Sequence, residues 1–358
     1  MALFAINCLL LFARVPDFYD FSDGTGLLYK LYRDEISGNR LEGHDDEVIF
    51  WGVDDRHEEF VEKMKKLKVL RVPATMRPDS NDHSWGIFFE SAPPVYRVTG
   101  IGGHAFNGLP ALEEIVLSEG IVYIDPFSTN GIPAKRINIP ASMTSVYPGL
   151  FRGYESKWEK VTVAKGNPNY SSLDGLLYSK NQDTLWVCPS AHQGDIKLPA
   201  TVKVIYDRAF SDTKNIGRVI LPEGLTSIGE STFSESNITQ VNIPGSIKIL
   251  PRRIMALCRQ LKQVTIDEGV EVIGESAFTC SYIETITLPS TIKEVGDEAF
   301  MLCDKVRDVY YKGLMPPTIG KDCFRFVDLS KITLHVPAEA LDTYRSLCQG
   351  IFADVVAI

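Results

Sequence analysis

The densest set of side chains that could bind a metal lies near the N-terminus, in two short clusters: His44, Asp45, Asp46, Asp54, Asp55 and His57. Imidazole nitrogens and carboxylate oxygens bind divalent cations when they converge. Helix capping explains part of this set more simply, because Asp55 and Glu58 have the spacing of a capping box. We therefore expect no metal and no cofactor. No Ser, His and Asp set and no carboxylate pair stands out as a catalytic centre.

The chain has seven cysteines, an odd number that does not suggest a disulfide framework. Cys258, Cys280 and Cys303 recur just after a large apolar residue in successive segments. This regularity favours small buried free thiols stacked as a ladder, because a free cysteine packs as a compact apolar residue. A disulfide between neighbouring segments is the second choice. Zinc is the third, because the chain has no Cys-x-x-Cys pair.

Polar residues also recur in and beside short β-type runs such as Val241-Asn242-Ile243. Successive side chains of a strand point to opposite faces, so the middle residue and the one before the run should point outward together. Parallel strands would hold the members of each column about 4.8 Å apart. A solvated surface and a recognition surface remain alternatives for any single position, and we favour the face as a whole for binding. The candidate binding residues are Arg136, Asn138, Lys160, Thr162, Arg218, Ile220, Gln240, Asn242, Gln263, Thr265, Thr287 and Tyr310.

These columns require a repeating architecture, and the stretch from Leu261 to Phe300 shows the same apolar pattern twice. A period of about 22–24 residues indicates a solenoid, in which each repeat covers the apolar edge of its neighbour. A large apolar residue marks each repeat, and we expect these markers to be buried: Phe106, Phe127, Phe151, Phe210, Phe233, Met255, Phe278, Phe300 and Phe324. Four glycines precede such markers and are expected to make turns: Gly229, Gly274, Gly296 and Gly320.

The pattern predicts four parts: residues 1–13, 14–95, 96–337 and 338–358. The first is an apolar run, too short to cross a bilayer, for which a signal peptide and a buried first strand are the alternatives. The second is an N-terminal capping region with a degenerate repeat and a helix over about residues 56–66. The third is the solenoid. The last is a C-terminal cap whose helix should bury Leu341, Tyr344 and Leu347 on one face.

An insertion within the solenoid, residues 166–195, reads as a β-hairpin that leaves the stack. Its large side chains include Tyr170, Leu176, Leu177, Tyr178 and Trp186. We favour the account in which Leu177, Trp186 and Val187 pack on the stack itself. The alternative joins the outer side of the hairpin to Thr162, Arg218 and Ile220 as one ligand platform, because aromatic and arginine anchors dominate recognition.

The composition narrows the class of partner. The net charge is −9, and the only basic cluster is the short Lys63–Lys68 segment, which argues against nucleic acid. Apolar residues at 44% and charged residues at 23% are ordinary for a globular protein. No later segment has the length and apolarity of a membrane span.

The chain resembles the BspA-like leucine-rich repeat proteins of bacterial surfaces in two motifs. One is the cadence Ile-x-Leu-Pro, Ile-x-x-Ile-Gly-x-x-Ala-Phe, seen from Ile286 to Phe300, and the other is the Cys-x-x-Leu pattern, seen from Cys280 to Ile283. The resemblance extends over about residues 98–337. It implies a β-rich leucine-rich repeat solenoid with a parallel sheet along one face. It also implies an extracellular or cell-surface protein that recognises a protein or glycan and is not an enzyme.

Two other functions stay open at this stage. One is a carbohydrate- or peptide-processing enzyme with its site in the N-terminal region or the insertion, which would need polar side chains converging in a deep pocket. The other is a purely architectural surface protein. The ligand and the oligomeric state do not follow from the sequence.

Overall fold

The computed structural model describes residues 20–22, 27–31, 47–53, 58–78, 95–153 and 155–358. The apolar run at residues 1–13 and the histidine and aspartate clusters lie outside these ranges. The chain divides into two compact units. Unit 1 is Met1–Leu150 with Ala164–Asn167, and unit 2 is Phe151–Val163 with Pro168–Ile358.

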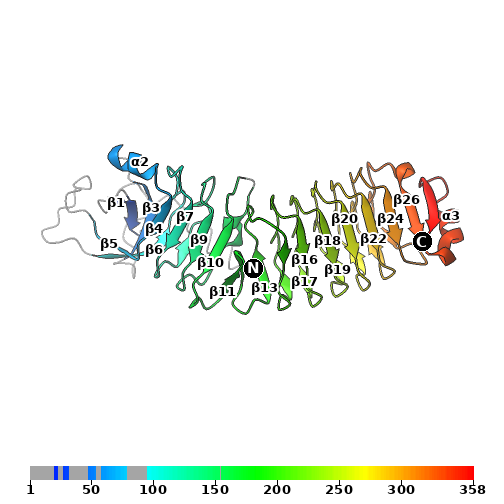
Figure 1. Ribbon diagram of the computed structural model, residues 1–358, viewed down its shortest axis with the longest axis horizontal. Helices are drawn as coiled ribbons and strands as arrows, with labels where there is room; N and C mark the ends of the chain where they lie inside the picture. The colour runs from blue at the N-terminus through cyan, green and yellow to red at the C-terminus, as the bar shows by residue number, and fades with distance from the viewer. Residues whose placement is uncertain (1–19, 23–26, 32–46, 54–57, 79–94, 154) are drawn as a thin grey trace, which may run out of the picture. The chain divides into compact units, whose positions relative to one another are not determined.

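Unit 1 combines antiparallel and parallel pairing (Figure 1). Its first sheet runs β1 (Asp20–Ser22), β2 (Leu27–Leu31), β3 (Glu47–Val53), β6 (Tyr96–Ile101) and β5 (Thr75–Met76), with β8 (Tyr123–Ile124) also on β6. A second, parallel set contains β4 (Val69–Val72), β7 (Glu114–Leu117) and β9 (Arg136–Ile139). The predicted helix is present as α2 (Glu58–Met64), which buries Met64. The degenerate repeat at β4 therefore pairs with the regular repeats that follow it.

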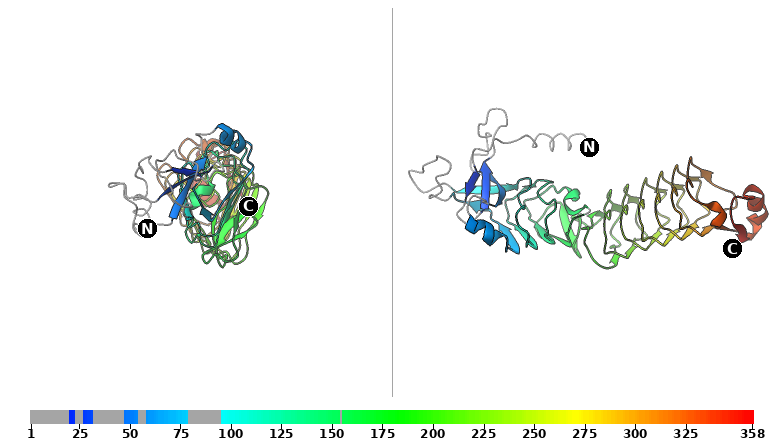
Figure 2. Two further views of the ribbon diagram at one scale, coloured as in Figure 1. Left: turned by 90° about the vertical axis from the view of Figure 1, so that its left-hand side faces the viewer. Right: turned by 90° about the horizontal axis from the view of Figure 1, so that it is seen from above.

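Unit 2 is built on one long parallel sheet, which we call the main sheet (Figures 1 and 2). It runs β14 (Ile196–Lys197), β16 (Arg218–Ile220), β18 (Gln240–Ile243), β20 (Gln263–Ile266), β22 (Thr285–Leu288), β24 (Asp308–Tyr311), β26 (Thr333–Val336) and β27 (Asp354–Ala357). Each repeat forms one coil, and successive coils lie side by side in sequence order. The predicted β-rich solenoid with a parallel sheet along one face is confirmed.

Each coil adds a second, shorter strand on another flank. One group is β13 (Thr184–Val187), β15 (Val204–Ile205) and β17 (Ser227–Ile228). The other is β19 (Ile249–Leu250), β21 (Val272–Ile273), β23 (Glu294–Val295) and β25 (Thr318–Ile319). The remaining strands are β10 (Lys160–Val163), β11 (Tyr170–Leu173) and β12 (Leu176–Ser179), and the short helices are η1 (Pro148–Phe151), η2 (Leu329–Lys331), η3 (Ala338–Ala340) and α3 (Leu341–Leu347).

The alternation expected from the sequence appears strand by strand. In β18, Val241 and Ile243 are buried while Gln240 and Asn242 are exposed. Between the two strand flanks lies a continuous core of apolar side chains. The marker rings stack from coil to coil. Phe278 and Phe300 lie 5.1 Å apart between centroids with an interplanar angle of 3°. The markers Phe106, Phe151, Phe210, Phe233, Met255, Phe278 and Phe300 are buried as predicted, and Phe324 is partly buried.

Phe127 is an exception, and its prediction as a core residue is wrong, because 46% of it is exposed. Thr129 occupies the marker position instead and is buried. It follows Ile124 by five residues, as Phe278 follows Ile273. Its hydroxyl donates a hydrogen bond to a backbone carbonyl of the next coil at 3.2 Å. The residue type was misleading here, whereas an even repeat spacing would have selected the threonine.

The Phe278→Ala variant should lose about 3–5 kcal/mol of unfolding free energy, because truncating a buried aromatic removes packing on both neighbouring coils. The Phe127→Ala variant is the matched control and should change stability by less than about 0.5 kcal/mol, as exposed substitutions do. Urea denaturation followed by circular dichroism measures both. Equal losses in the two variants would show that the assigned positions within the coil are wrong.

The recurring glycines are explained by close backbone approach, not by turn conformation as predicted. A Cβ at Gly229, Gly274, Gly296 or Gly320 would lie 2.4, 2.6, 2.8 or 2.5 Å from a backbone atom of the preceding coil. Positive φ angles of 53° to 59° occur instead two residues before the marker, at His104, Arg208, Ser231, Arg253, Ser276, Glu298 and Asp322. A second left-handed position follows the marker by two residues: Gly108, Gly131, Gly153, Asp212, Glu235, Leu257, Cys280, Leu302 and Phe326.

These two kinds of position predict opposite responses to mutation. Gly296→Ala should destabilise unit 2 by about 1–3 kcal/mol, because its methyl group would push the neighbouring backbone away. Leu302→Gly, at an exposed left-handed position, should be nearly neutral, because the relieved strain of about 1 kcal/mol offsets the flexibility of glycine. Thermal denaturation of both variants tests the assignment, and a greater loss in Leu302→Gly would contradict it.

The insertion does not simply leave the stack. Its strands β11 and β12 form the expected antiparallel hairpin, with Asp174 and Gly175 at φ angles of 52° and 88° in the turn. The third strand, β13, pairs antiparallel with β12 and parallel with β15, so it rejoins the coils. Leu176, Tyr178 and Leu185 of these strands belong to the core of unit 2, so the segment packs on the coils through those side chains. Leu177 and Val187 are fully buried, and their predicted packing on the stack stays a prediction. Trp186 is half-buried.

The cysteine ladder is confirmed in part. Cys258 and Cys303 are buried free thiols, and their sulfurs lie 3.0 Å from the carbonyl oxygens of Phe233 and Phe278 in the preceding coils. Cys280 is also free, but it is only half-buried and stands one position earlier in its coil. Ser281 fills the ladder position, where its hydroxyl donates to a carbonyl oxygen of the preceding coil.

Burial raises the pKa of the Cys258 and Cys303 thiols to about 12. At pH 8 each should therefore be almost wholly protonated, with a thiolate fraction of about 10⁻⁴, and unreactive in the folded state. We expect iodoacetamide to modify Cys280 at least tenfold faster, and all three at similar rates after denaturation. Peptide mass spectrometry gives the rates. A disulfide between any two of them, or rapid native labelling of Cys258, would contradict the ladder.

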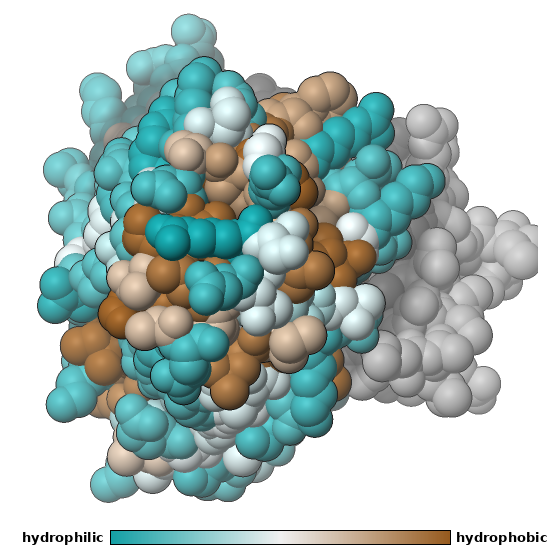
Figure 3. Space-filling view, turned by 90° about the vertical axis from the view of Figure 1, so that its right-hand side faces the viewer, coloured by the Kyte–Doolittle hydropathy of each residue, from teal (hydrophilic) through white to brown (hydrophobic). Residues whose placement is uncertain are grey.

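The C-terminal cap differs from the predicted helix in two respects. In α3, Tyr344 is buried and Leu341 partly buried, but Leu347 is exposed, so the predicted three-residue face is only partly correct. The chain then adds β27, which extends the main sheet by pairing with β26. Figure 3 views the right-hand side of Figure 1, where apolar and polar residues alternate over the surface. Ile351 and Ile358 are the other exposed aliphatic side chains of this segment.

Candidate functional site

The outward residues of the main sheet form two parallel columns, which together we call the main-sheet face. The strand pairing aligns Arg218, Gln240, Gln263, Thr285, Asp308 and Thr333 in the first column. Beside it run Asn242, Thr265, Thr287, Tyr310 and His335, with Lys197 and Ile220 paired at the β14 end. The ladder of backbone hydrogen bonds fixes the spacing between these side chains at about 4.8 Å per strand.

Eight of the predicted binding residues lie on this one face: Arg218, Ile220, Gln240, Asn242, Gln263, Thr265, Thr287 and Tyr310. The other four do not belong to the main sheet. Lys160 and Thr162 lie in β10, and Arg136 and Asn138 lie in β9 of unit 1. The alternative platform, which joins the outer side of the hairpin to Thr162, Arg218 and Ile220, stays a prediction. Two of the hairpin aromatics, Tyr170 and Trp186, contact each other, and Trp186 also contacts Tyr206.

The unit 1 residues have structural partners. The Asn138 side chain accepts a hydrogen bond from the Leu117 backbone nitrogen at 2.7 Å and donates one to the Leu117 carbonyl at 2.8 Å. Arg136 forms an ion pair with Glu114 of the preceding coil, with 3.2 Å between Nε and Oε2. Asn138 therefore continues the hydrogen-bonded ladder between coils, and its amide is used inside unit 1.

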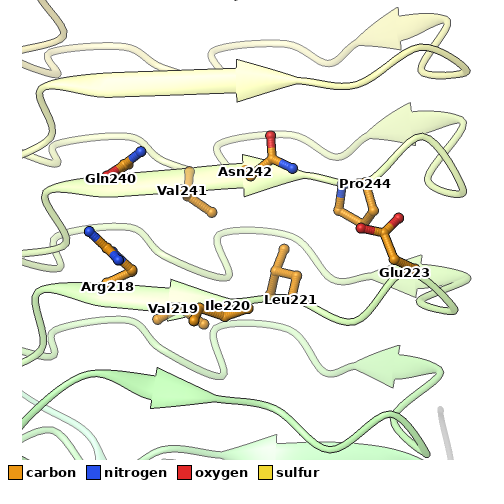
Figure 4. Close-up of a pocket in the computed structure, with 9 residues that line it drawn as sticks. All are labelled: Arg218, Val219, Ile220, Leu221, Glu223, Gln240, Val241, Asn242 and Pro244. Atoms are coloured by element: carbon orange, nitrogen blue, oxygen red, sulfur yellow. The ribbon is translucent and has the colours of Figure 1, made fainter.

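A pocket of about 260 Å³ opens on the main-sheet face between β16 and β18 (Figure 4). The strand ladder is short at this place. The pairing of β16 with β18 stops at Val219 and Val241, whereas β18 and β20 stay paired to Ile243. The lining residues are Arg218, Val219, Ile220, Leu221, Glu223, Gln240, Val241, Asn242 and Pro244.

The pocket combines an apolar floor with polar ends. Arg218 and Gln240 stand side by side where the strands begin, and Glu223 and Pro244 lie where the chains leave them (Figure 4). Ile220 is 45% exposed. Asn242 donates to an aspartate carboxylate of the next coil at 2.8 Å. Arg218 is exposed, and the described part of the chain offers its guanidinium no ion pair.

A second polar cluster lies further along the same face, on β24 and β26. Tyr310 and His335 stack with 4.0 Å between ring centroids and an interplanar angle of 11°. His335 Nε2 lies 2.8 Å from an Asp308 carboxylate oxygen. Four strand steps separate β16 from β24, so this cluster lies about 19 Å from the pocket. The two features bracket a polar stretch of amides and threonines.

The polar groups that line the pocket are Arg218, Glu223, Gln240 and Asn242. The pocket lining contains no histidine, cysteine or serine that could act as a nucleophile or as its base. Among the described residues there is no group of three or more metal-ligating side chains. The helices of the described ranges include none long and apolar enough to cross a membrane.

Sequence reasoning missed Lys197 and His335. Lys197 belongs to the short strand β14, whose segment Ile196-Lys197-Leu198-Pro199 carries the same Ile-x-Leu-Pro cadence as other repeats and could have been found by it. His335 was missed because the apolar run Ile332-Thr333-Leu334 suggests Thr333 as the outward middle residue. In the structure Thr333 pairs with Asp308, and His335 pairs with Tyr310. No sequence pattern indicated Glu223, whose position depends on where the strands part.

Comparisons with known structures show the same fold. A leucine-rich repeat protein from Eubacterium ventriosum is 17% identical in sequence. The match covers 90% of this chain and 88% of that protein, with a TM-score of 0.46. The pneumococcal vaccine antigen PcpA is 15% identical in sequence. The match covers 95% of this chain and 99% of that protein, with a TM-score of 0.53. No curated protein matches the chain in sequence.

The comparison with protein families gives a direct assignment. The BspA type leucine-rich repeat region matches in six copies over residues 92–172 and 189–307. These residues include most coils of both units. The two strands of each coil, the stacked marker residues and the close backbone contact at the glycines explain why the repeat has a regular spacing. The chain belongs to the BspA-type leucine-rich repeat family.

Proposed function

We propose that this protein is a non-catalytic, surface-exposed binding module that holds a partner protein on the main-sheet face of unit 2. The observation that carries the proposal is the pocket on a hydrogen-bonded sheet, lined by the exposed Ile220 and by Arg218, which forms no ion pair with the residues that the structure describes. Solenoids use such broad, preformed surfaces for recognition. A sheet of this kind loses little conformational freedom on binding, which favours affinity.

The dimensions and residue types of the face also favour a protein ligand. The distance of about 19 Å between the pocket and the Tyr310–His335 cluster fits a standard protein interface, which buries roughly 800 Å² on each partner. Arginine and tyrosine are the residues that most often dominate binding energy. Here they lie at the two ends of the face, with amides and threonines between them. The pocket fits an apolar side chain with a carboxylate nearby, because Arg218 supplies an available positive charge.

The location at the cell surface rests on family membership and on the shared fold with PcpA, which is a vaccine antigen. Extracellular adhesion is the corresponding role. A purely architectural protein would use the same stack but would have no need of an exposed Ile220 beside an open pocket. An enzyme remains less well supported, because the pocket lining lacks a catalytic set.

The function can be tested with two isoleucines that differ in location. Ile220 lies at the pocket, and Ile249, which is 61% exposed, lies on the second strand flank. We expect Ile220→Asp to weaken partner binding by at least tenfold, which is about 1.4 kcal/mol, because it introduces a charge at the centre of the interface. Ile249→Asp should bind as the parent protein does.

The measurement starts with immobilised parent protein and solubilised surface proteins of candidate host and bacterial cells. A captured protein is then titrated against the parent and both variants by surface plasmon resonance, after circular dichroism has confirmed that each variant folds. Equal binding by the parent and Ile220→Asp would remove the pocket from the interface. Equal weakening in both variants would show that binding does not depend on the main-sheet face.

A further inference from the structure

A pair of aromatic rings replaces small residues at one position of the second strand flank. The position follows the inward residue of each short strand, and in successive coils it holds Trp186, Tyr206, Gly229, Pro251, Gly274, Gly296 and Gly320. Backbone hydrogen bonds confirm the alignment. Tyr206 donates to Leu185 and Gly229 donates to Ile205, both at 2.9 Å. The later coils therefore need no ring at this position.

Tyr206 is an exposed aromatic residue that packs on a second ring. The ring of Trp186 lies 4.7 Å away between centroids, with a tilt of 49°. In the next coil the aligned residue is Gly229, so the aromatic pair does not continue there. Tyr206 is 40% exposed. Tyr170 packs edgewise on Trp186 at 6.3 Å and 72°, which holds the indole in place.

The indole nitrogen of Trp186 is a second independent observation. Its Nε1 is enclosed and has no hydrogen-bond partner in the described part of the chain. Buried donors without partners are rare, because a donor that is removed from water without a new acceptor destabilises the fold. The exposed Tyr206 ring packs on this indole, so the donor without a partner belongs to the ring that supports Tyr206.

We propose that Tyr206, supported by Trp186 and Tyr170, forms a carbohydrate-binding site that is separate from the main-sheet face. A pyranose ring has an apolar C–H face, which stacks on an aromatic ring, and a rim of hydroxyl groups. The surroundings match that rim. Lys203, Asp207, Arg208, Ser227 and Glu230 are exposed polar residues in the same two coils.

A protein partner fits this place less well. Protein interfaces centre on apolar cores that exclude water, and their hot spots lie within larger contact areas. Here the exposed Tyr206 ring lies in coils whose other exposed residues include Lys203, Asp207 and Arg208. The site is also on the flank of β13, β15 and β17, not on the main sheet, so either site can be lost without the other.

The test uses intrinsic fluorescence, because a sugar stacked on Tyr206 would change the emission of Trp186. The full chain is titrated with cellotetraose, chitotetraose, mannotetraose and maltotetraose. We expect a saturable change with at least one of them. Tyr206→Ala should weaken that binding by about tenfold or more, the size expected for one aromatic stacking contact. Tyr206→Phe, which keeps the ring, should restore it.

A matched control is Tyr147→Ala, because Tyr147 is 58% exposed at the corresponding position of a coil in unit 1. This variant should bind as the parent does. Trp186→Phe should lose the ligand-dependent fluorescence change. The proposal is overturned if none of the four sugars gives a saturable change, or if Tyr206→Ala binds like the parent. Equal weakening by Tyr147→Ala would also overturn it, since that result means non-specific contact.

Discussion

The structure depends on the backbone hydrogen bonds that join each coil to the next. Around the marker position they run from Phe233 to Ile254, from Met255 to Ala277 and from Phe278 to Ala299, each at 2.8 Å. Two backbones this close leave no room for a Cβ at certain points, which explains glycines such as Gly274 and Gly296. The same geometry requires left-handed conformations on both sides of the marker. The repeated residues are therefore consequences of one constraint, the distance between coils.

That constraint also makes the main-sheet face rigid, and it determines where a ligand can be held. A fully paired ladder leaves a nearly flat surface of side chains spaced by the strands. Between β16 and β18 the pairing ends early, and a pocket opens there beside Ile220. The most distinctive feature of the face thus arises where the regular pairing is interrupted, and no additional element is needed to build it.

The aromatic site has the opposite origin. At Trp186 and Tyr206 the chain places large rings where most later coils have glycine. These rings lie in the coils next to the insertion, where β12 and β13 bring additional aromatic side chains to the same flank. Departures from the repeat therefore mark the two candidate sites. Regular positions such as Phe278 and Cys303 are buried in the core and keep the coils in place.

The sequence by itself determined the repeat, the two-sided strands and the residues that face outward, because a period of about 22–24 residues and strict alternation leave few ways to bury the apolar positions. Eight predicted binding residues accordingly lie on one sheet. The predictions failed where residue type was followed in place of spacing, as at Phe127. They also failed in the last repeat, where His335 and not Thr333 pairs with Tyr310. Only the tertiary structure decided where the strand ladder ends, that Asn138 is used within unit 1, and that Tyr206 lies between an indole and a glycine. These outcomes depend on which coil lies beside which and on how closely the backbones approach, and such distances between residues far apart in the chain are not encoded in any local pattern.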